Sequence, residues 1–198
     1  NARLGSKVTV LWGCAKEMGL GGWHLGCVLT ESKRLHQALC RIVRISGCPS
    51  NPIQDQLAGV LEDRRFIQEY STSNANILKA GCADVVKACD NLGFSYVPAS
   101  AGLFVMIRLV TLMKETTYAN ERALFRHMFT ECNVVMSPGE GSMAPPGWFR
   151  CCYACAPEGA VEEAFSRIAK LKREDIVVTE EDISGSKITE EAMRNFFF

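Results

Sequence analysis

One lysine stands out among the residues that could do chemistry, because of the small residues around it. Lys16 lies in the segment GCAKEMGLGGWHLG, which spans residues 13–26. An apolar run, VTVLW at 8–12, precedes this segment and predicts a strand that leads into the lysine. A strand followed by small residues can place an amine at the edge of a sheet with room for a large flat cofactor. A lysine that has lost part of its hydration presents the free amine that forms a Schiff base with an aldehyde.

Two other interpretations of this segment need no Schiff base. A solvated lysine in a glycine-rich turn is the plainer one, and the spacing alone favours it. A nucleotide-binding glycine loop fits less well, because the G-x-G-x-x-G spacing is not met. Gly19 and Gly21 would be its first two glycines, but His24 stands where the third belongs.

The segment resembles the pyridoxal-phosphate (PLP) attachment motif of class I aminotransferases. That motif reads small, any, small, Lys, two residues, Gly, apolar, any, Gly, any, Arg, apolar, Gly. This sequence meets each fixed place except the arginine, which is His24. The resemblance implies that Lys16 holds the cofactor covalently and that its amine, once displaced by substrate, moves the proton on the substrate Cα.

Two later segments extend the resemblance toward the 1-aminocyclopropane-1-carboxylate (ACC) synthase branch. SAGLFVMIRL at 100–109 is similar to the A-G-L-F strand of that branch. SPG at 137–139 and PGWFR at 146–150 are similar to its S-P-G loop and its P-G-W-F-R strand. The resemblance implies that Arg150 grips the α-carboxylate of the substrate, which suits a planar guanidinium that binds carboxylates bidentately. Without the resemblance, Arg150 would be interpreted as a surface arginine at the end of a strand.

The cofactor-binding positions depart from the family pattern in three places. His24 replaces the arginine that grips the cofactor phosphate, and it is shorter and lacks the guanidinium fork. Gly13 and Ala15 stand where the family often has phosphate-binding hydroxyls. We therefore expect Lys16, Gly13, Ala15 and His24 to form the cofactor site, with a weakened hold on the phosphate.

Composition and charge limit the partners of the chain. Its 198 residues are 47% hydrophobic, and its basic and acidic side chains number 22 each, so the formal net charge is zero. A surface for nucleic acid or anionic membranes needs a basic excess, and a membrane span needs roughly 18 apolar residues in a row. We expect neither partner, and instead a small amino-acid-type substrate. The resemblance adds a homodimer.

The sequence has ten cysteines and three histidines, which are the residue types of disulfides and zinc sites. Most of the cysteines fall in apolar runs, where a thiol behaves as a small hydrophobic group. The histidines are far apart, so a zinc site is not expected. We predict buried free thiols, no metal, and a reducing, cytoplasmic location.

The remaining pattern mixes strands with helices and predicts the α/β class. We expect strands at 7–12, 25–30, 94–97, 103–109, 133–136 and 148–154, and helices at 35–45, 53–61, 64–92, 118–132 and 158–171.

The resemblance implies the C-terminal half of a fold type I PLP enzyme. We expect residues 1–62 to complete a large α/β domain, residues 63–172 to form a small α/β domain, and the polar tail 173–198 to be weakly ordered. The chain starts at Asn1 without a methionine and enters an apolar run at once, so a preceding segment is expected.

Three functions remain open. The first is a C–S lyase of the ACC synthase type that acts on S-adenosylmethionine. The second is an aminotransferase that exchanges an amino group with a 2-oxo acid, and the third is a degenerate relative without catalysis. In the family, the preceding half supplies the aspartate that pairs with the pyridine nitrogen of PLP, so we expect this chain alone to be inactive.

Overall fold

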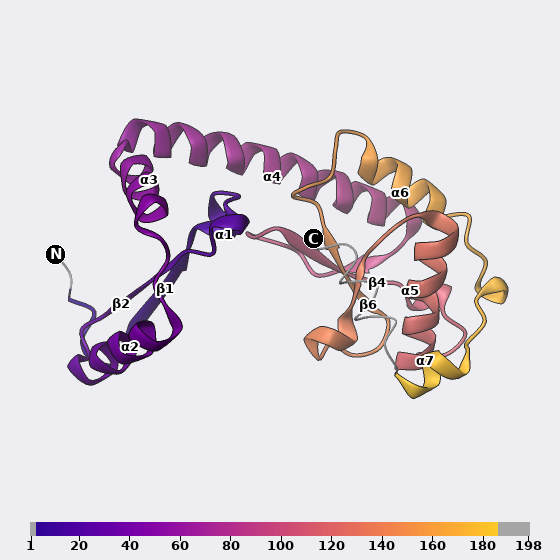
Figure 1. Ribbon diagram of the computed structural model, residues 1–198. Coiled ribbons are helices and arrows are strands. Elements are labelled where there is room, and N and C mark those ends of the chain that lie inside the picture. Colours follow the sequence, from indigo (N-terminus) through magenta and orange to yellow (C-terminus); the bar gives the residue numbers. More distant parts are fainter. Residues whose placement is uncertain (1–2, 186–198) are drawn as a thin grey trace. The chain divides into compact units, whose positions relative to one another are not determined.

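The computed structural model describes residues 3–185, and the chain divides into two units (Figure 1). The first unit is Asn1–Ser71 and the second is Thr72–Phe198. The division falls inside one long helix, α4 (Arg64–Leu92), a few residues after the boundary expected at residue 62. Each unit is described by itself below.

The first unit is built on a two-stranded antiparallel sheet. Its pairing runs from Thr9 opposite Thr30 to Gly13 opposite Gly26. The elements in chain order are β1 (Thr9–Gly13), α1 (Cys14–Glu17), the 3-10 helix η1 (Gly21–Trp23), β2 (Gly26–Thr30), α2 (Lys33–Ser46) and α3 (Asn51–Glu62). Ser32 caps α2, because its side chain accepts a hydrogen bond from the backbone of Leu35.

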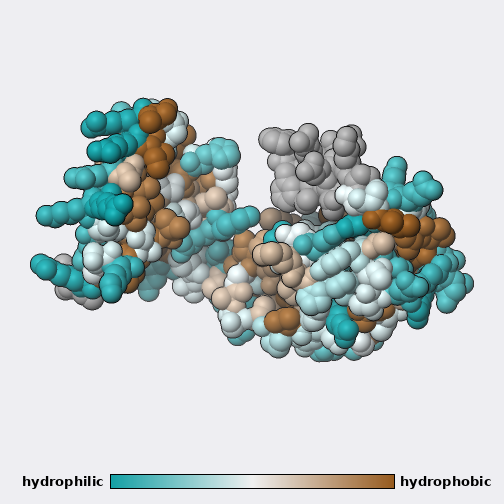
Figure 2. Space-filling model, turned by 90° about the horizontal axis from the view of Figure 1, so that it is seen from below, coloured by the Kyte–Doolittle hydropathy of each residue, from teal (hydrophilic) through white to brown (hydrophobic). Residues whose placement is uncertain are grey.

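The first unit buries little of its apolar surface. Its buried core consists of Cys14, Leu25 and Leu57, with partly buried neighbours around them. No residue of α2 is buried. Large apolar side chains of the sheet and of α2 are exposed instead, among them Leu11 at 77% and Ile45 at 89%, and Figure 2 shows brown hydrophobic residues on this part of the molecule.

The second unit contains a four-stranded antiparallel sheet in the order β3-β4-β6-β5. Its elements after α4 are β3 (Ser95–Tyr96), β4 (Phe104–Arg108), η2 (Val110–Leu112), α5 (Tyr118–Cys132), β5 (Ser137–Pro138), η3 (Gly139–Ser142), β6 (Trp148–Cys152), α6 (Ala160–Ile168), η4 (Arg173–Asp175) and α7 (Glu180–Ser184). Figure 1 shows α5 and α6 beside the strands β4 and β6.

Alternation along the strands directs one face of this sheet into the core. Val105 and Ile107 of β4 and Phe149 of β6 are buried with apolar residues of α4, α5 and α6. The alternate positions are half-buried or exposed, and Phe104 and Arg150 are among the half-buried ones. The helices therefore cover one face of the sheet, and Arg150 stands on the other.

Most predicted elements are present, but the strand expected at 133–136 is not. Asn133 has a left-handed backbone, with a φ of 52°, and ends α5. The backbone N–H of Val134 still donates to the carbonyl of Met128, at 3.1 Å. Residues 133 and 134 thus form the C-terminal cap of α5 and are not free to pair as a strand. Strand pairing starts only at Ser137, opposite Arg150.

The polar tail was expected to be weakly ordered from residue 173 on, but the structure gives residues 173–185 two short helices. Thr179 and Asp182 form a capping box that starts α7. Ile176 is 1% exposed and belongs to the core of the second unit. The spaced apolar residues of a mainly polar segment therefore anchor it. The remainder of the predicted tail, 186–198, lies outside the described residues.

The prediction that most cysteines are buried is wrong. All ten are free, and the buried ones are Cys14, Cys89, Cys132 and Cys151. Burial raises the pKa of Cys89 to about 11 and that of Cys151 to about 12, so these two thiols stay protonated at neutral pH. Five others are exposed because strand ends, turns and the uncovered helix α2 carry them: Cys27, Cys40, Cys48, Cys152 and Cys155.

The part of the chain that the structure describes has no helix with the length and apolarity needed to cross a bilayer.

Candidate functional site

Lys16 lies on α1, the short helix that directly follows β1. Cys14 anchors this helix, because its side chain is fully buried and its thiol donates to the carbonyl of Leu25 at 3.3 Å. The indole N–H of Trp12 donates to the carboxylate of Glu17 and ties the strand to the end of the helix. The side chain of Lys16 is left exposed.

The amine of Lys16 forms no ion pair among residues 3–185. Glycines line the chain after it, and a Cβ added at Gly19, Gly21 or Gly22 would meet no atom within 4 Å. The amine is therefore unpaired among the described residues, and the glycines that follow it have open space beside them. These are two properties that a lysine needs in order to bind an aldehyde-bearing cofactor.

The segment that carries Lys16 and His24 connects the paired ends of β1 and β2. Gly13 and Gly26 face each other at the end of the pairing. A Cβ on Gly26 would lie 3.1 Å from the carbonyl oxygen of Trp12, so the close approach of the strands favours glycine there. The elements α1 and η1 form the turn that connects β1 to β2 at this end of the sheet.

His24 ends η1 with a left-handed backbone, at a φ of 48°. Its backbone N–H donates to the carbonyl of Gly21 at 3.3 Å, and its side chain is exposed. Histidine is among the residue types that tolerate this conformation. Gly13, Ala15, Lys16 and His24 thus fall within one strand–turn–strand motif of the first unit.

Arg150 lies in the middle of β6, opposite Met106 of β4 and Ser137 of β5. Its guanidinium stands over the ring of Phe104, with the central carbon 4.5 Å from the ring centroid. This cation–π contact orients the guanidinium without neutralising it. Among the described residues, no carboxylate forms an ion pair with Arg150, so its charge is available to a bound anion.

The structure describes the sequence-predicted residues as two separate sets. Lys16, Gly13, Ala15 and His24 belong to the first unit, and Arg150 belongs to the second. The sequence did not reveal Phe104 as a support of Arg150, because the contact depends on the pairing of β4 with β6. Glu121 was also missed, since an isolated glutamate in a helix gives no signal of burial.

The cavities of the two units have different linings. In the first unit, a cavity of about 250 Å³ is lined by neighbours of Lys16 and by part of α4, namely Trp12, Glu17, Met18, Cys27, Leu61, Ile67, Tyr70 and Ser71. Its wall includes the residues on either side of the lysine turn but not Lys16. This cavity therefore borders the turn but does not contain the lysine.

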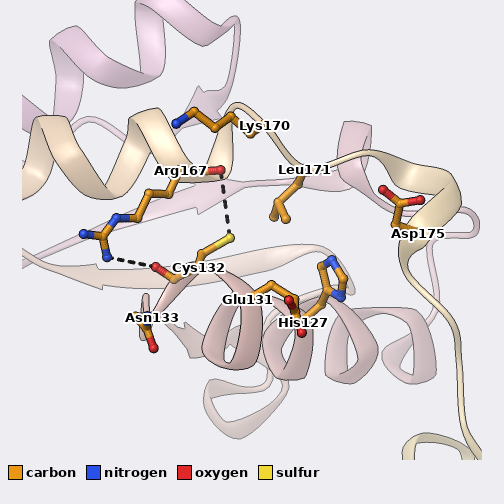
Figure 3. Close-up of a pocket in the computed structure, with 8 residues that line it drawn as sticks. All are labelled: His127, Glu131, Cys132, Asn133, Arg167, Lys170, Leu171 and Asp175. Atoms are coloured by element: carbon orange, nitrogen blue, oxygen red, sulfur yellow. Dashed lines mark hydrogen bonds between the residues drawn. The ribbon is translucent and has the colours of Figure 1, made fainter.

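A polar cavity of about 570 Å³ lies in the second unit, between the ends of α5 and α6 (Figure 3). Arg167 donates to the carbonyl of Cys132 at 3.2 Å and to the carboxylate of Glu163 at 2.8 Å. The guanidinium of Arg167, which lines this cavity, is therefore already hydrogen-bonded to other groups of the protein. Among the described residues, no group of three potential metal ligands is present there or elsewhere.

Comparison with protein families gives one match over most of the chain. The family described as "Aminotransferase class I and II" matches residues 2–168. Among curated proteins, 1-aminocyclopropane-1-carboxylate synthase 6 of Arabidopsis thaliana is 32% identical over 163 residues, which cover 81% of this chain and 32% of that protein. 1-Aminocyclopropane-1-carboxylate synthase CMW33 of Cucurbita maxima is 29% identical over 177 residues, covering 86% and 36%. The chain spans about a third of the length of these relatives.

Solved structures share the fold at lower sequence identity. The aromatic aminotransferase of Pyrococcus horikoshii OT3 matches with a TM-score of 0.73 at 22% identity, covering 85% of this chain and 44% of that one. The aspartate aminotransferase of Thermus thermophilus with maleate matches with a TM-score of 0.71 at 19% identity, covering 82% and 41%.

Proposed function

The chain belongs to the class I and II aminotransferase family, and from that premise we propose that it supplies the cofactor lysine and the substrate-binding arginine of a PLP-dependent enzyme. Members of this family are PLP-dependent enzymes, and their fold is fold type I. The single observation that carries the proposal is the environment of Lys16. Its amine is exposed, unpaired among residues 3–185, and set on a glycine-bordered turn at the end of a strand.

The residues of the turn fit the cofactor in part. Lys16 would hold PLP through its Nζ, and His24 and the backbone near Gly13 and Ala15 would bind its phosphate. The bound cofactor supplies an electron sink for charge that develops on the substrate Cα. A histidine side chain and two residues without hydroxyls give this phosphate fewer donors than an arginine and two hydroxyls would.

The chain's own groups then divide the work on an α-amino acid. Arg150 binds the α-carboxylate through its guanidinium, which the ring of Phe104 orients. The Lys16 Nζ would accept the proton from the substrate Cα. The same two residues serve a lyase and an aminotransferase, because the reactions differ only in what happens after that proton has moved.

For the substrate, we favour S-adenosylmethionine and an ACC synthase-like lyase reaction. The curated relatives named above are ACC synthases, and one of them is 32% identical to this chain. The alternative is transfer of an amino group to a 2-oxo acid. The aminotransferase structures are below 25% identical, so their likeness supports the fold and does not favour either reaction.

A third possibility is a relative that has lost catalysis. Its support is the weakened phosphate site at His24, Gly13 and Ala15. We further propose that the whole protein is a homodimer, on the strength of the family alone, and that it lies in a reducing, cytoplasmic compartment, since all ten cysteines are free. These proposals concern the polypeptide that carries this chain, since the chain spans about a third of its relatives.

The first test is Lys16→Ala in the polypeptide that carries this chain, with Lys33→Ala as a matched control. Lys33 is also an exposed lysine of the first unit, at the start of α2. After treatment with PLP and borohydride, mass spectrometry should find one cofactor on the wild type and on Lys33→Ala, and none on Lys16→Ala. Cofactor fixed to Lys16→Ala would refute the assignment.

The second test separates the reactions. The wild-type protein is incubated with S-adenosylmethionine, and separately with an amino acid and 2-oxoglutarate. ACC formation supports the lyase, and a new amino acid supports the aminotransferase. If PLP attaches at Lys16 and neither product forms, the non-catalytic alternative is favoured.

A further inference from the structure

Glu121 is a fully buried carboxylate in the first turn of α5. Among the described residues, it forms no ion pair. Its Oε1 accepts the backbone N–H of Glu140 at 2.9 Å, and its Oε2 accepts the backbone N–H of Gly147 at 2.6 Å. Burial raises the pKa of this carboxyl, and the two N–H donors oppose that rise.

The two donors lie at opposite ends of the loop 139–147, which joins β5 to β6. Each oxygen of Glu121 therefore holds one end of the loop against α5. The next residue, Arg122, donates to the carboxylate of Glu140 at 2.7 Å and to the backbone carbonyl of Asp182 at 2.6 Å. One turn of α5 thus holds Glu140 by both its backbone and its side chain.

The hydrogen bond between Glu121 and Gly147 also restrains the start of β6, because β6 begins at the next residue. The carbonyl of Gly147 accepts the N–H of Leu109 at 2.8 Å. Its φ is +92°, and an added Cβ would lie 2.4 Å from Cγ1 of Val110. Both peptide groups of Gly147 are therefore fixed, and the chain passes too close to Val110 to admit a side chain.

Arg150 follows three residues later, opposite Ser137 at the other end of the same loop. The position of its guanidinium is set by the start of β6 and by the pairing of β5 with β6. Both of these depend on the loop that Glu121 closes.

We propose that Glu121 is a positioning residue for substrate binding, which closes the loop 139–147 and thereby holds Arg150 in place for the α-carboxylate. The inference rests on the proposed function, because that function makes Arg150 the carboxylate-binding group. Glu121 does not touch the substrate. It acts through two backbone hydrogen bonds and through the strand they start.

A role in stability alone is a weaker explanation of this carboxylate. Burying a carboxylate without a cation partner is costly, and an apolar side chain of similar size often stabilises a core better. The hydrogen bonds of Glu121 are also directed at one loop only.

The first test uses hydrogen exchange of the wild-type polypeptide and needs no variant. The amides of Glu140 and Gly147 should be the slowest to exchange in the loop 139–147. Fast exchange at both amides would overturn the proposal.

The second test compares Glu121→Ala and Glu121→Gln with Asp182→Asn. Asp182 is a buried carboxylate of the same unit, but its side chain binds Arg126 and Thr179 and does not touch the loop. Glu121→Ala should speed exchange across 139–150, and the binding of 2-aminoisobutyrate, an α-amino acid without a Cα proton, should weaken roughly tenfold. The near-isosteric Glu121→Gln keeps one acceptor and should show a smaller loss of both.

The expected kinetic signature is a raised KM with kcat changed less than about twofold, because the chemical groups are untouched. Asp182→Asn should speed exchange in α7 and leave KM unchanged. Unchanged loop exchange in both Glu121 variants, or a loss confined to kcat, would overturn this inference. A wild-type protein that attaches no PLP at Lys16 would instead overturn the proposed function, and the exchange result would still report on the loop.

Discussion

The two units differ in how much apolar surface each one buries. The second unit closes a core of buried residues drawn from three helices and the sheet. Among residues 3–71, the first unit buries only the apolar residues Cys14, Leu25 and Leu57, and its sheet and its helix α2 expose large aliphatic side chains. Such a surface is typical of one that another polypeptide segment covers. The difference indicates that the second unit is stable by itself, whereas the first unit needs contacts with a further polypeptide segment in order to be stable.

This contrast matters for the proposed function, because each unit carries one of the residues that we propose to act. Arg150 stands on a sheet that its own unit stabilises, whereas Lys16 stands on a short helix with a small core behind it. We therefore expect the geometry around Arg150 to be robust. We expect the geometry around Lys16 to depend on whatever covers the first unit.

The largest expected effect is the behaviour of the units as separate fragments. The fragment 64–198 keeps α4 whole and should unfold cooperatively in urea, as followed by circular dichroism. The fragment 1–63 should show no cooperative transition and should bind a hydrophobic dye, because it buries too little apolar surface. Cooperative unfolding of 1–63 would remove the contrast between the units.

A matched pair of substitutions sharpens the contrast. Ile107 is 0% exposed in β4, and Ile45 is 89% exposed in α2. Ile107→Ala should lower the free energy of unfolding by about 3 kcal/mol, since it removes core contacts and leaves a cavity. Ile45→Ala should change it by less than about 0.5 kcal/mol. Urea denaturation of the same polypeptide measures both, and equal losses would contradict the assigned cores.

A third prediction concerns the ordered tail of the second unit. Burial alone would raise the pKa of Asp182, but hydrogen bonds from Arg126 and Thr179 outweigh burial and lower it below its ordinary value. Since the folded pKa is lowered, Asp182 contributes stability above its ordinary value of 3.8, and this contribution is lost as the pH falls through the folded pKa. Asp182→Asn should therefore cost about 2 kcal/mol at neutral pH and progressively less in acid.

Urea titrations at neutral pH and at a pH of about 2.5 would measure this change. Glu121 is the matched contrast, because its pKa is raised. Its contribution is greatest below its ordinary value and falls as the pH rises through the folded pKa, so Glu121→Gln should remove a slope of the opposite sign. A loss in Asp182→Asn that is independent of pH would contradict the assignment of a charged Asp182.

The smallest expected effect lies at the phosphate end of the cofactor site. His24→Arg restores the guanidinium of the family motif and should tighten PLP binding up to about tenfold, the value of one charge-assisted hydrogen bond. The left-handed backbone of residue 24 reduces the gain, because arginine tolerates it less well than histidine. Spectral titration with PLP measures the change. Weaker binding by His24→Arg would place the phosphate elsewhere.

Local sequence determined the elements whose causes are local. The helix at 118–132 was predicted from its apolar spacing and has those bounds, although Asn133, which ends it, was assigned to a strand. The helix at 64–92 was likewise predicted with its observed bounds. The lysine motif and its preceding strand were also readable, because small residues and glycines around one amine form a short contiguous pattern.

Tertiary structure decided the features that depend on pairing across the chain. Phe104 and Arg150 are far apart in sequence and meet only because β4 pairs with β6. Glu121 has no distinguishing feature in the sequence. It becomes a buried acceptor for two backbone N–H groups only when α5 packs beside the loop 139–147. The exposure of the cysteines and of α2 also followed from packing, since an apolar pattern states which face could be buried but not whether a partner covers it.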